Sequence, residues 1–345
     1  MIETQKIKKI LIIQPRGTGD VVRTTVLFHN LKHHFQQASL DYLTDPINHQ
    51  VLDGLPVLNK VLGIDIRKTG TIKTLRIIRK NKYDLVIDLY GNPRTALITR
   101  LSGAIHRVGF KTKKRTYAYN HLVSANDPNI STIDRYFILM KALNIQVVDK
   151  KLYFPVERAN TKIIDEFFNH FESSLKIGLL LAGGWASKKF PGKRMAELGK
   201  KIKTELNAEI FIGYGPGEKS DFEEFKLHAD FEFNLLPDKG FTDVGYSSSK
   251  LDLVIVNDSG PMHVASAVGT KVLGIFGPTK PKNWAPYGDE NKWIRNEKLD
   301  CIACEKLNCP IPNHPCMNEL DLNEVLEIVK KMLKADNRQM TTEHS

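Results

Sequence analysis

The sequence lacks any apolar run long enough to cross a bilayer. Such a span takes about 20 consecutive apolar residues, whereas "ILII" at 10–13 has only the length of a β-strand. The opening "MIETQKIKK" also lacks the layout of a secretory signal peptide. We therefore expect a cytoplasmic protein without a membrane-spanning segment.

Two nucleotide-binding motifs are incomplete. The stretch "RGTGDVV" at 16–22 supplies Gly17 and Gly19, but Val22 occupies the place of the third glycine of a dinucleotide fingerprint. The acidic residue some twenty positions on, Asp41, falls inside the strand "SLDYL" and not at its end. No Walker spacing follows the glycine pair at 183–184. These absences argue against a nicotinamide-dependent oxidoreductase and against nucleoside triphosphate hydrolysis.

Acidic residues are in the minority. The 345 residues include 50 Lys and Arg against 39 Asp and Glu, a net charge of +11. Such an excess favours anionic partners such as nucleic acid, anionic lipid or phosphorylated small molecules, although a merely solvated basic surface explains it equally well. No helix-turn-helix or RNA-binding pattern accompanies the basic clusters at 111–115 and 186–194, so nucleic acid is not an expected partner.

Cysteine is confined to one segment. All four cysteines form the string Cys-x2-Cys-x4-Cys-x6-Cys, made up of Cys301, Cys304, Cys309 and Cys316. Four thiolates at such short spacing are typical of a tetrahedral site that selects zinc or iron. The sequence therefore predicts a structural metal, with free buried cysteines or a disulfide pair as the alternatives. Nothing near the string indicates a catalytic metal.

Short apolar strands alternate with amphipathic helices along the chain. The strands are expected at 8–14, 38–44, 57–65, 83–90 and 106–110, and after a polar segment at 147–160 the rhythm restarts at 175–182, 208–214, 251–258 and 271–277. This pattern predicts two doubly wound α/β domains, 1–155 and 156–335, that face a central cleft, followed by an irregular tail at 336–345. The cysteine string lies within the second domain.

Ligands of doubly wound sheets sit at the carboxyl ends of the strands, and four loops there carry suitable residues. In the first, Asp20 either caps a helix or acts as a general base. In the second, "NDSGPMHV" at 257–264 begins a helix whose free amides suit an anion, with Ser259 and His263 on one side of it. His263 is also compatible with an ordinary helix-face histidine.

The other two loops contain glycines. "LAGGWASKK" at 181–189 places Gly183 and Gly184 before Lys188, an arrangement that suits a diphosphate, with a solvated lysine pair as the alternative. "GYGPGEK" at 213–219 contains Glu218, which either accepts hydrogen bonds from ribose hydroxyls or belongs to an ordinary turn.

Together these segments resemble glycosyltransferase family 9, the ADP-heptose:lipopolysaccharide heptosyltransferases, over roughly residues 8 to 330. The resemblance rests on "ILIIQPRGTGDVVRTT", "YDLVIDLYGNPRTALITRLSGA", "SKKFPGKRMAEL", "NDSGPMHVASAVGTKVLGIFGPTKPKNWAPYG" and "CIACEKLNCPIPNHPCM". It implies the GT-B fold of two Rossmann-like domains, with the acceptor bound by the N-terminal domain and the nucleotide-sugar by the C-terminal one. The chain departs from the family in "LAGGWAS", in Ser259 where threonine is usual, and in "FTDVGYSSSK", a poor helix sequence.

The resemblance also implies roles for individual residues. Asp20 falls at the position of the catalytic base and Lys188 at that of the lysine that contacts the donor phosphates. Donor-binding positions are Gly183, Gly184, Ser187, Glu218, Asp258, Ser259, Gly260, Met262 and His263. We expect acceptor contacts from Arg16, Thr18, Asn92, Arg94, Lys111 and Arg115, because inner-core lipopolysaccharide carries carboxylates and phosphates.

The predicted activity is therefore inverting transfer of a heptose from ADP-heptose to an inner-core lipopolysaccharide acceptor. Asp20 deprotonates the acceptor, while Lys188 and the helix that follows Ser259 stabilise the departing ADP without a catalytic metal. We expect peripheral contact with the cytoplasmic face of the inner membrane. The alternative within the family is another nucleotide-sugar, or a protein or other glycan as the acceptor.

Overall fold

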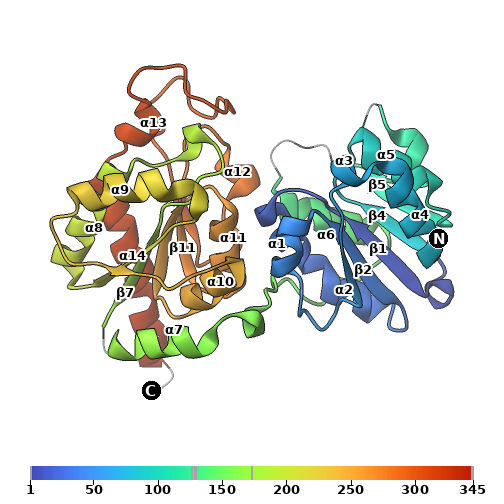
Figure 1. The fold of residues 1–345 in the computed structure, drawn as a ribbon, viewed down its shortest axis with the longest axis horizontal. Helices are drawn as coiled ribbons and strands as arrows, with labels where there is room; N and C mark the ends of the chain where they lie inside the picture. The colour runs from blue at the N-terminus through green and yellow to red at the C-terminus, as the bar shows by residue number, and fades with distance from the viewer. Residues whose placement is uncertain (1, 113, 126, 128–129, 172–173, 343–345) are drawn as a thin grey trace. The chain divides into compact units, whose positions relative to one another are not determined.

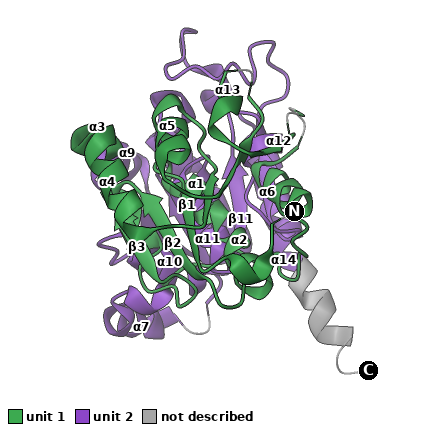
Figure 2. Ribbon diagram, turned by 90° about the vertical axis from the view of Figure 1, so that its right-hand side faces the viewer, with its two compact units in different colours: residues 1–155 green, residues 156–345 purple. Residues whose placement is uncertain are grey.

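The computed structural model describes residues 2–112, 114–125, 127, 130–171 and 174–342, the last eight of them by backbone alone. Two compact units divide the chain, Met1–Pro155 and Val156–Ser345 (Figure 2). The division falls inside the polar segment at 147–160. Among the described residues, none of the helices combines the length and the apolar character that a membrane crossing requires.

Unit 1 is built on one parallel sheet of six strands in the order β3-β2-β1-β4-β5-β6. The strands are β1 (Lys9–Ile13), β2 (Ser39–Thr44), β3 (Lys60–Gly63), β4 (Leu85–Asp88), β5 (His106–Phe110) and β6 (His121–Val123). The helices are α1 (Thr18–Thr24), α2 (Val26–His34), α3 (Ile66–Thr69), α4 (Thr71–Asn81), α5 (Pro93–Leu101) and α6 (Thr132–Ala142), with 3-10 turns η1 (Thr4–Lys6), η2 (Pro46–Val51) and η3 (Thr116–Ala118) (Figure 1).

Unit 2 repeats the same winding. Its parallel sheet has the order β12-β11-β10-β7-β8-β9. The strands are β7 (Lys176–Leu180), β8 (Glu209–Gly213), β9 (Asn234–Leu235), β10 (Leu253–Asn257), β11 (Lys271–Ile275) and β12 (Lys292–Ile294). The helices are α7 (Thr161–Phe168), α8 (Gly192–Leu206), α9 (Lys219–His228), α10 (Phe241–Ser249), α11 (Gly260–Ala267), α12 (Pro281–Trp284), α13 (Pro315–Asn318) and α14 (Leu322–Thr342), with 3-10 turns η4 (Val156–Arg158), η5 (Asn169–Phe171), η6 (Ala186–Lys188) and η7 (Pro216–Glu218).

The winding determines where each unit can bind a ligand. The central strands are apolar on both faces, because helices cover both sides of a doubly wound sheet; β4 and β10 are buried throughout. The strand order reverses between β1 and β4 in unit 1, and between β7 and β10 in unit 2. Loops part at this switch point and leave a crevice at the carboxyl ends of the strands. The expected class of two Rossmann-like domains is confirmed.

Several boundaries differ from expectation. The helical segment after β1 is divided into α1 and α2 at Thr25, where the Thr24 and Thr25 hydroxyls bond back to the carbonyls of Val21 and Val22. The short strands β6, β9 and β12 and the helices α7 and α9 were not anticipated. The expected irregular tail at 336–345 is helical as far as Thr342, and 343–345 lie outside the described residues.

The poor helix sequence "FTDVGYSSSK" nevertheless forms α10. Tertiary contacts compensate for its low propensity: Ser247 Oγ donates to Asp238 Oδ1 at 2.5 Å, and Thr270 Oγ1 donates to the Ser248 carbonyl at 2.7 Å. The Asp243 carboxylate accepts the Lys239 and Asn160 amides at the start of the helix. The Ser247 hydroxyl is therefore buried and bonded, although a serine in a typical surface helix faces solvent.

Candidate active site

In unit 2 the loops after β7 and β10 bring Lys188 to Asp258. Lys188 Nζ lies 2.7 Å from Asp258 Oδ2, and both side chains are largely buried. Thr279, from the loop after β11, donates to the same carboxylate oxygen at 2.6 Å. Three adjacent strands therefore deliver one cation, one anion and one hydroxyl to the carboxyl edge of the sheet, where the switch point predicts a ligand site.

Local contacts fix these loops. Asn257, the last residue of β10, donates through Nδ2 to the Ala182 carbonyl at 2.9 Å and accepts the Phe190 amide at 3.2 Å. Its buried side chain thus ties the β10 end to both ends of the β7 loop. The Lys188 ammonium also lies 4.4 Å above the Trp185 ring, a cation–π contact that holds the lysine in place without a second anion.

Helix α11 starts immediately beside the ion pair. Ser259 is its N-cap with extended backbone, and Pro261 lies in the first turn. The first amides of a helix have no partner within the helix and carry partial positive charge. Ser259 Oγ is buried and finds no hydrogen-bond partner among the described residues, so it is available to an anion bound here.

The other residues expected on this helix are less accessible. Met262 is fully buried in an apolar cluster with Val272 and Phe276, so only its backbone amide faces the helix start. His263 is also buried, at 3% exposure. The burial of these two side chains could not be predicted from the sequence, because the same helix positions can face either a bound ligand or the protein core.

The two glycines of the β7 loop differ in their surroundings. A Cβ at Gly183 would collide with the Lys189 side chain, whereas one at Gly184 would meet none of the described atoms within 4 Å. Gly184 is therefore the open side of the loop. Lys189 pairs with a different carboxylate from that of its neighbour Lys188, because its Nζ lies 2.5 Å from Asp221 Oδ2 of α9. Glu218 accepts the Gly215 amide at 3.0 Å and closes the turn before α9.

Ser187 has a structural position rather than an open one. Its hydroxyl donates to the Lys306 carbonyl at 2.5 Å and its amide to the Leu307 carbonyl at 3.1 Å. His314 Nε2 lies 2.9 Å from the Ser187 carbonyl and donates to it. The Lys188 loop is thereby fastened to the segment 305–314 that contains part of the cysteine string.

The predicted four-cysteine metal site is not supported. Among the described residues, no three His, Cys, Asp or Glu side chains are arranged to hold a metal ion. Cys304 is exposed, Cys301 and Cys309 are half-buried, and Cys316 is buried. Burial raises the pKa of the Cys316 thiol to about 12. Spacing alone could not reveal that the four environments differ so much.

In unit 1 the expected base lies in the first turn of α1. The Asp20 carboxylate forms an ion pair with the buried Arg23 and remains 30% exposed. Gly17 precedes the helix at φ +81°, and a Cβ there would collide with the Asp20 carboxylate. The glycine is therefore required twice, once for the backbone conformation and once for the space that the carboxylate occupies.

A pocket of about 230 Å³ lies at the carboxyl ends of β1 to β4. Its polar lining comprises Arg16, Asp45, Arg67, Asn92 and Arg94. Arg16 Nε lies 3.5 Å from Asp45 Oδ2. Burial, with a smaller contribution from Asp65, raises the pKa of Asp45, and Arg16 opposes the rise. Three guanidinium groups around so small a volume are an arrangement that suits an anion.

Asn92 has a further role at this pocket. Its side chain accepts the Thr95 amide at 2.8 Å in a capping box that starts α5, with Pro93 in the first turn. Thr18 donates instead to Asn48 Oδ1 at 2.8 Å. Lys111 and Arg115 follow β5 and do not line the pocket, and Lys113 lies outside the described residues.

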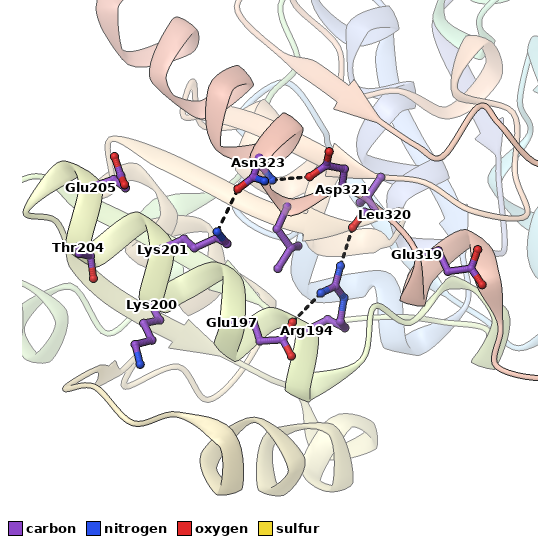
Figure 3. A pocket seen from close by; sticks show the side chains of 11 residues that line it. Arg194, Glu197, Lys200, Lys201, Thr204, Glu205, Glu319, Leu320, Asp321 and Asn323 are labelled. Carbon is purple, nitrogen blue, oxygen red and sulfur yellow. Dashed lines mark hydrogen bonds and ion pairs between the residues drawn. The ribbon is translucent and has the colours of Figure 1, made fainter.

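A second, more open groove runs along the outer face of α8. It is lined by α8 residues from Arg194 to Glu205 and by 319–323 (Figure 3). Arg194 donates to Glu197 on the same helix at 2.6 Å and to the Leu320 carbonyl on the other side of the groove at 2.6 Å, while Lys201 donates to Asn323. None of the residues expected to bind substrate lines this groove. Its charged groups are engaged in packing α14 against α8.

Two Rossmann-like units in one chain, each with a switch point at the carboxyl ends of its strands, are the architecture of the GT-B fold. Residues 71–314 match the model of Glycosyltransferase family 9 (heptosyltransferase). The chain therefore belongs to glycosyltransferase family 9.

Individual relatives agree with this assignment. The chain is 41% identical to lipooligosaccharide heptosyltransferase 2 of Campylobacter jejuni, over 94% of this chain and 98% of the relative. Its fold is similar to the structure of Escherichia coli ADP-heptose lps heptosyltransferase II, with a TM-score of 0.74, 19% identity and coverage of 95% and 99%. E. coli heptosyltransferase WaaC with ADP-2-deoxy-2-fluoro heptose gives a TM-score of 0.68 at 19% identity, with coverage of 94% and 99%.

Sequence reasoning missed several residues at these sites: Asp45, Arg67, Trp185, Thr279 and His314. Arg67 could have been found, because it directly follows the expected strand at 57–65 and so must lie at the carboxyl edge of the sheet. Thr279 belongs to the turn "FGPTKP", which suggests a pocket wall but not a hydroxyl directed at Asp258. His314 comes from a distant irregular segment, and no local pattern indicates its contact with Ser187.

Proposed function

We propose that this chain is an inverting heptosyltransferase, which moves a heptose from ADP-heptose to an inner-core lipopolysaccharide acceptor made of Kdo and heptose. The observation that carries the proposal is the Lys188–Asp258 pair next to the start of α11. The names of the relatives support it, since they include lipooligosaccharide heptosyltransferase 2 and a WaaC structure with an ADP-heptose analogue.

Unit 2 is the proposed donor domain. When the donor binds, the Lys188 ammonium leaves the Asp258 carboxylate and pairs with the diphosphate. The Asp258 carboxylate then keeps its hydrogen bond from Thr279. The buried Ser259 hydroxyl and the free amides of Gly260 and Met262 complete the anion site. Gly184 gives the open approach, and Glu218 accepts the ribose hydroxyls.

Unit 1 is the proposed acceptor domain. The pocket of Arg16, Arg67, Arg94 and Asn92 binds a carboxylate or phosphate of the acceptor sugar, because guanidinium groups pair with such anions in fixed geometry. The Asp20 carboxylate, in the loop after β1, lies on the same sheet edge and acts on the acceptor hydroxyl. Thr18, Lys111 and Arg115 provide peripheral contacts.

The proposed reaction is a single displacement. Asp20 takes the proton of the acceptor hydroxyl while that oxygen forms a bond to the anomeric carbon of the heptose. The bond from this carbon to the phosphate oxygen breaks, its electron pair goes to ADP, and the configuration inverts. Lys188 and the positive end of α11 stabilise the charge that develops on ADP, so the proposal assigns no role to a catalytic metal. It places the enzyme in the cytoplasm, at the face of the inner membrane.

Donor profiling tests this proposal. The protein is incubated with ADP-heptose, ADP-hexose, UDP-hexose or GDP-hexose, and with deacylated inner-core acceptors that end in Kdo or in heptose. We expect nucleotide release that depends on the acceptor with ADP-heptose alone. If ADP-heptose is inert with both acceptors, the proposal is wrong. Release from another donor, or with a protein or other glycan, supports the alternative family 9 transferase instead.

A further inference from the structure

One segment of unit 1, residues 89–126, combines exposed apolar side chains with basic residues and contains no acidic residue. Residues 89–126 contain seven basic residues and no Asp or Glu, in a chain whose total net charge is +11; the seven are Arg94, Arg100, Arg107, Lys111, Lys113, Lys114 and Arg115. Lys113 lies outside the described residues. Much of the chain's net charge is therefore concentrated in α5 and in the segment up to β6, and it does not arise from a general excess of lysine.

Large apolar side chains are exposed in the same segment. Leu97, Leu101, Ile105 and Tyr117 are between 40% and 68% exposed; we call these four residues the α5 surface. Leu97 and Leu101 are one turn apart on α5 and so share a helix face. Ile105 follows the end of that helix. Single exposed apolar residues are ordinary, but a cluster of them requires an explanation.

Packing holds the α5 surface together. Ala96, which precedes Leu97, forms a small buried cluster with Ala118 and Tyr119 of the η3 region. Tyr117 is thereby placed next to α5. Arg107 connects the segment after α5 to η3, because its guanidinium donates to the Ala104 carbonyl at 2.7 Å and to the Ala118 carbonyl at 3.2 Å.

The same helix begins at the anion pocket. Asn92, Pro93 and Arg94 at the start of α5 line the pocket. A ligand whose anionic head occupies the pocket would therefore meet the α5 surface along one helix. Exposed apolar residues among lysines and arginines are the composition of a surface that lies on anionic lipid. Nucleic acid would require polar side chains at these positions instead.

We propose that the α5 surface docks the protein on a bilayer of anionic phospholipid. Leu97, Leu101, Ile105 and Tyr117 enter the headgroup region, and Arg100 and Lys114 contact the lipid phosphates. This inference goes beyond the proposed transfer reaction, since its four apolar residues take no part in that reaction. It explains how the enzyme reaches an acceptor that is anchored in a bilayer.

Vesicle co-sedimentation of the full chain tests the docking, with no donor or acceptor present. We expect at least tenfold stronger binding to vesicles of phosphatidylglycerol and phosphatidylcholine than to phosphatidylcholine alone, weakening as salt rises. The variant Leu101→Ser/Ile105→Ser/Tyr117→Ser should lose at least tenfold. Its control, Ile72→Ser/Ile163→Ser/Leu227→Ser, changes residues that are 48% to 81% exposed and should bind as the unmodified chain does.

Charge is tested separately. Arg100→Glu/Lys114→Glu should abolish binding to the anionic vesicles, whereas Lys219→Glu/Lys226→Glu, an equal change of charge on α9, should retain it. Circular dichroism verifies the fold of each variant, and Ile105→Ser alone serves if the triple variant is unstable. Equal binding by the triple variant and its control would overturn the inference, and so would binding to DNA in place of vesicles.

Activity separates this inference from the proposed function. With an acceptor embedded in vesicles, the triple variant should lose at least tenfold in kcat/KM, and with a deacylated acceptor it should retain full activity. Loss with both acceptors would place the residues in the catalytic machinery and contradict the docking role. If no nucleotide is released by any form, the transfer proposal fails while the vesicle result still stands.

Discussion

Lys188 and Asp258 form an ion pair across the switch point of the second sheet, with Nζ 2.7 Å from Oδ2. The pair joins a lysine from the loop after β7 to an aspartate directly after β10, two strands that lie side by side. Because Thr279 bonds the same oxygen, the carboxylate keeps a partner when the lysine leaves it.

Replacement of Lys188 by methionine should lower kcat by about 100-fold to 1000-fold, the usual cost of removing one charge-stabilising donor. It should also cost about 3–5 kcal/mol of unfolding free energy, because Asp258 is left buried without its cation. The double variant Lys188→Met/Asp258→Asn should recover most of the stability but none of the activity. Steady-state ADP release and urea unfolding measure the two quantities.

The neighbouring lysine provides the control. Lys189 pairs with Asp221 at 2.5 Å, so Lys189→Met should cost about 1 kcal/mol of stability, as partly exposed ion pairs do. Its kcat should stay within about threefold, since no transition-state contact is lost. An equal fall in kcat for both variants would show that the lysines act on loop structure alone.

Replacement of Gly17 by alanine tests the space around the base. The methyl group would displace the Asp20 carboxylate, so we expect a loss of tenfold or more in kcat with the KM for ADP-heptose unchanged. Gly70 is the matched control: its φ is +82° against +81° for Gly17, but a Cβ there meets none of the described atoms within 4 Å. Gly70→Ala should show only the backbone strain, about 1 kcal/mol. A Gly17→Ala enzyme with normal kcat would remove Asp20 from the reaction.

Replacement of Arg67 by alanine should raise the KM for the acceptor about 10-fold to 100-fold, the value of one charge-assisted hydrogen bond. The KM for ADP-heptose should not change, because the pocket belongs to the acceptor domain. Lys68 is exposed and does not line the pocket, so Lys68→Ala should leave both constants within about twofold. A rise in both KM values would indicate that the pocket supports the fold instead of the acceptor.

Asp238 should make unit 2 less stable as pH rises. Burial raises the pKa of Asp238 to about 6, and the Ser247 hydroxyl only partly opposes this. The folded protein therefore retains a proton that the unfolded chain loses near pH 4, and stability falls between about pH 4 and 6. Asp238→Asn keeps the Ser247 contact and should gain about 1–3 kcal/mol at pH 7 but almost nothing at pH 4.

Tryptophan fluorescence during urea unfolding measures this effect, because Trp185, Trp284 and Trp293 all lie in unit 2. Stability differences that are equal at pH 4 and pH 7 would show that folding does not shift the pKa of Asp238, and would contradict the prediction.

The fold was accessible from the sequence because strand and helix periods alternate clearly, and the loops at the carboxyl ends followed from the topology. Asp20, Lys188 and Asp258 each lie in the loop or the first helical turn that follows an apolar strand, and a doubly wound sheet leaves such positions at its binding edge. The pairing of Lys188 with Asp258 could not be read, because strand adjacency joins residues 70 positions apart. The environments of Ser187 and Met262 depend on contacts with Lys306 and Val272, which lie farther along the chain.

The cysteine string shows a case in which the sequence pattern misled. Its spacing permits a shared metal, yet the backbone conformation between the cysteines determines whether the thiols converge. Ala303, Glu305, Asn313 and His314 all adopt left-handed backbone conformations, which no spacing rule anticipates. The segment is instead bonded to the Lys188 loop through Ser187.

The most direct test of the account is steady-state ADP release from ADP-heptose by the Asp20→Asn variant, with an inner-core acceptor. The amide keeps the shape of the side chain but cannot take a proton. We predict a loss of about 100-fold to 10,000-fold in kcat, the range for a general base, with the KM for ADP-heptose within about twofold. Full turnover by Asp20→Asn would contradict the account.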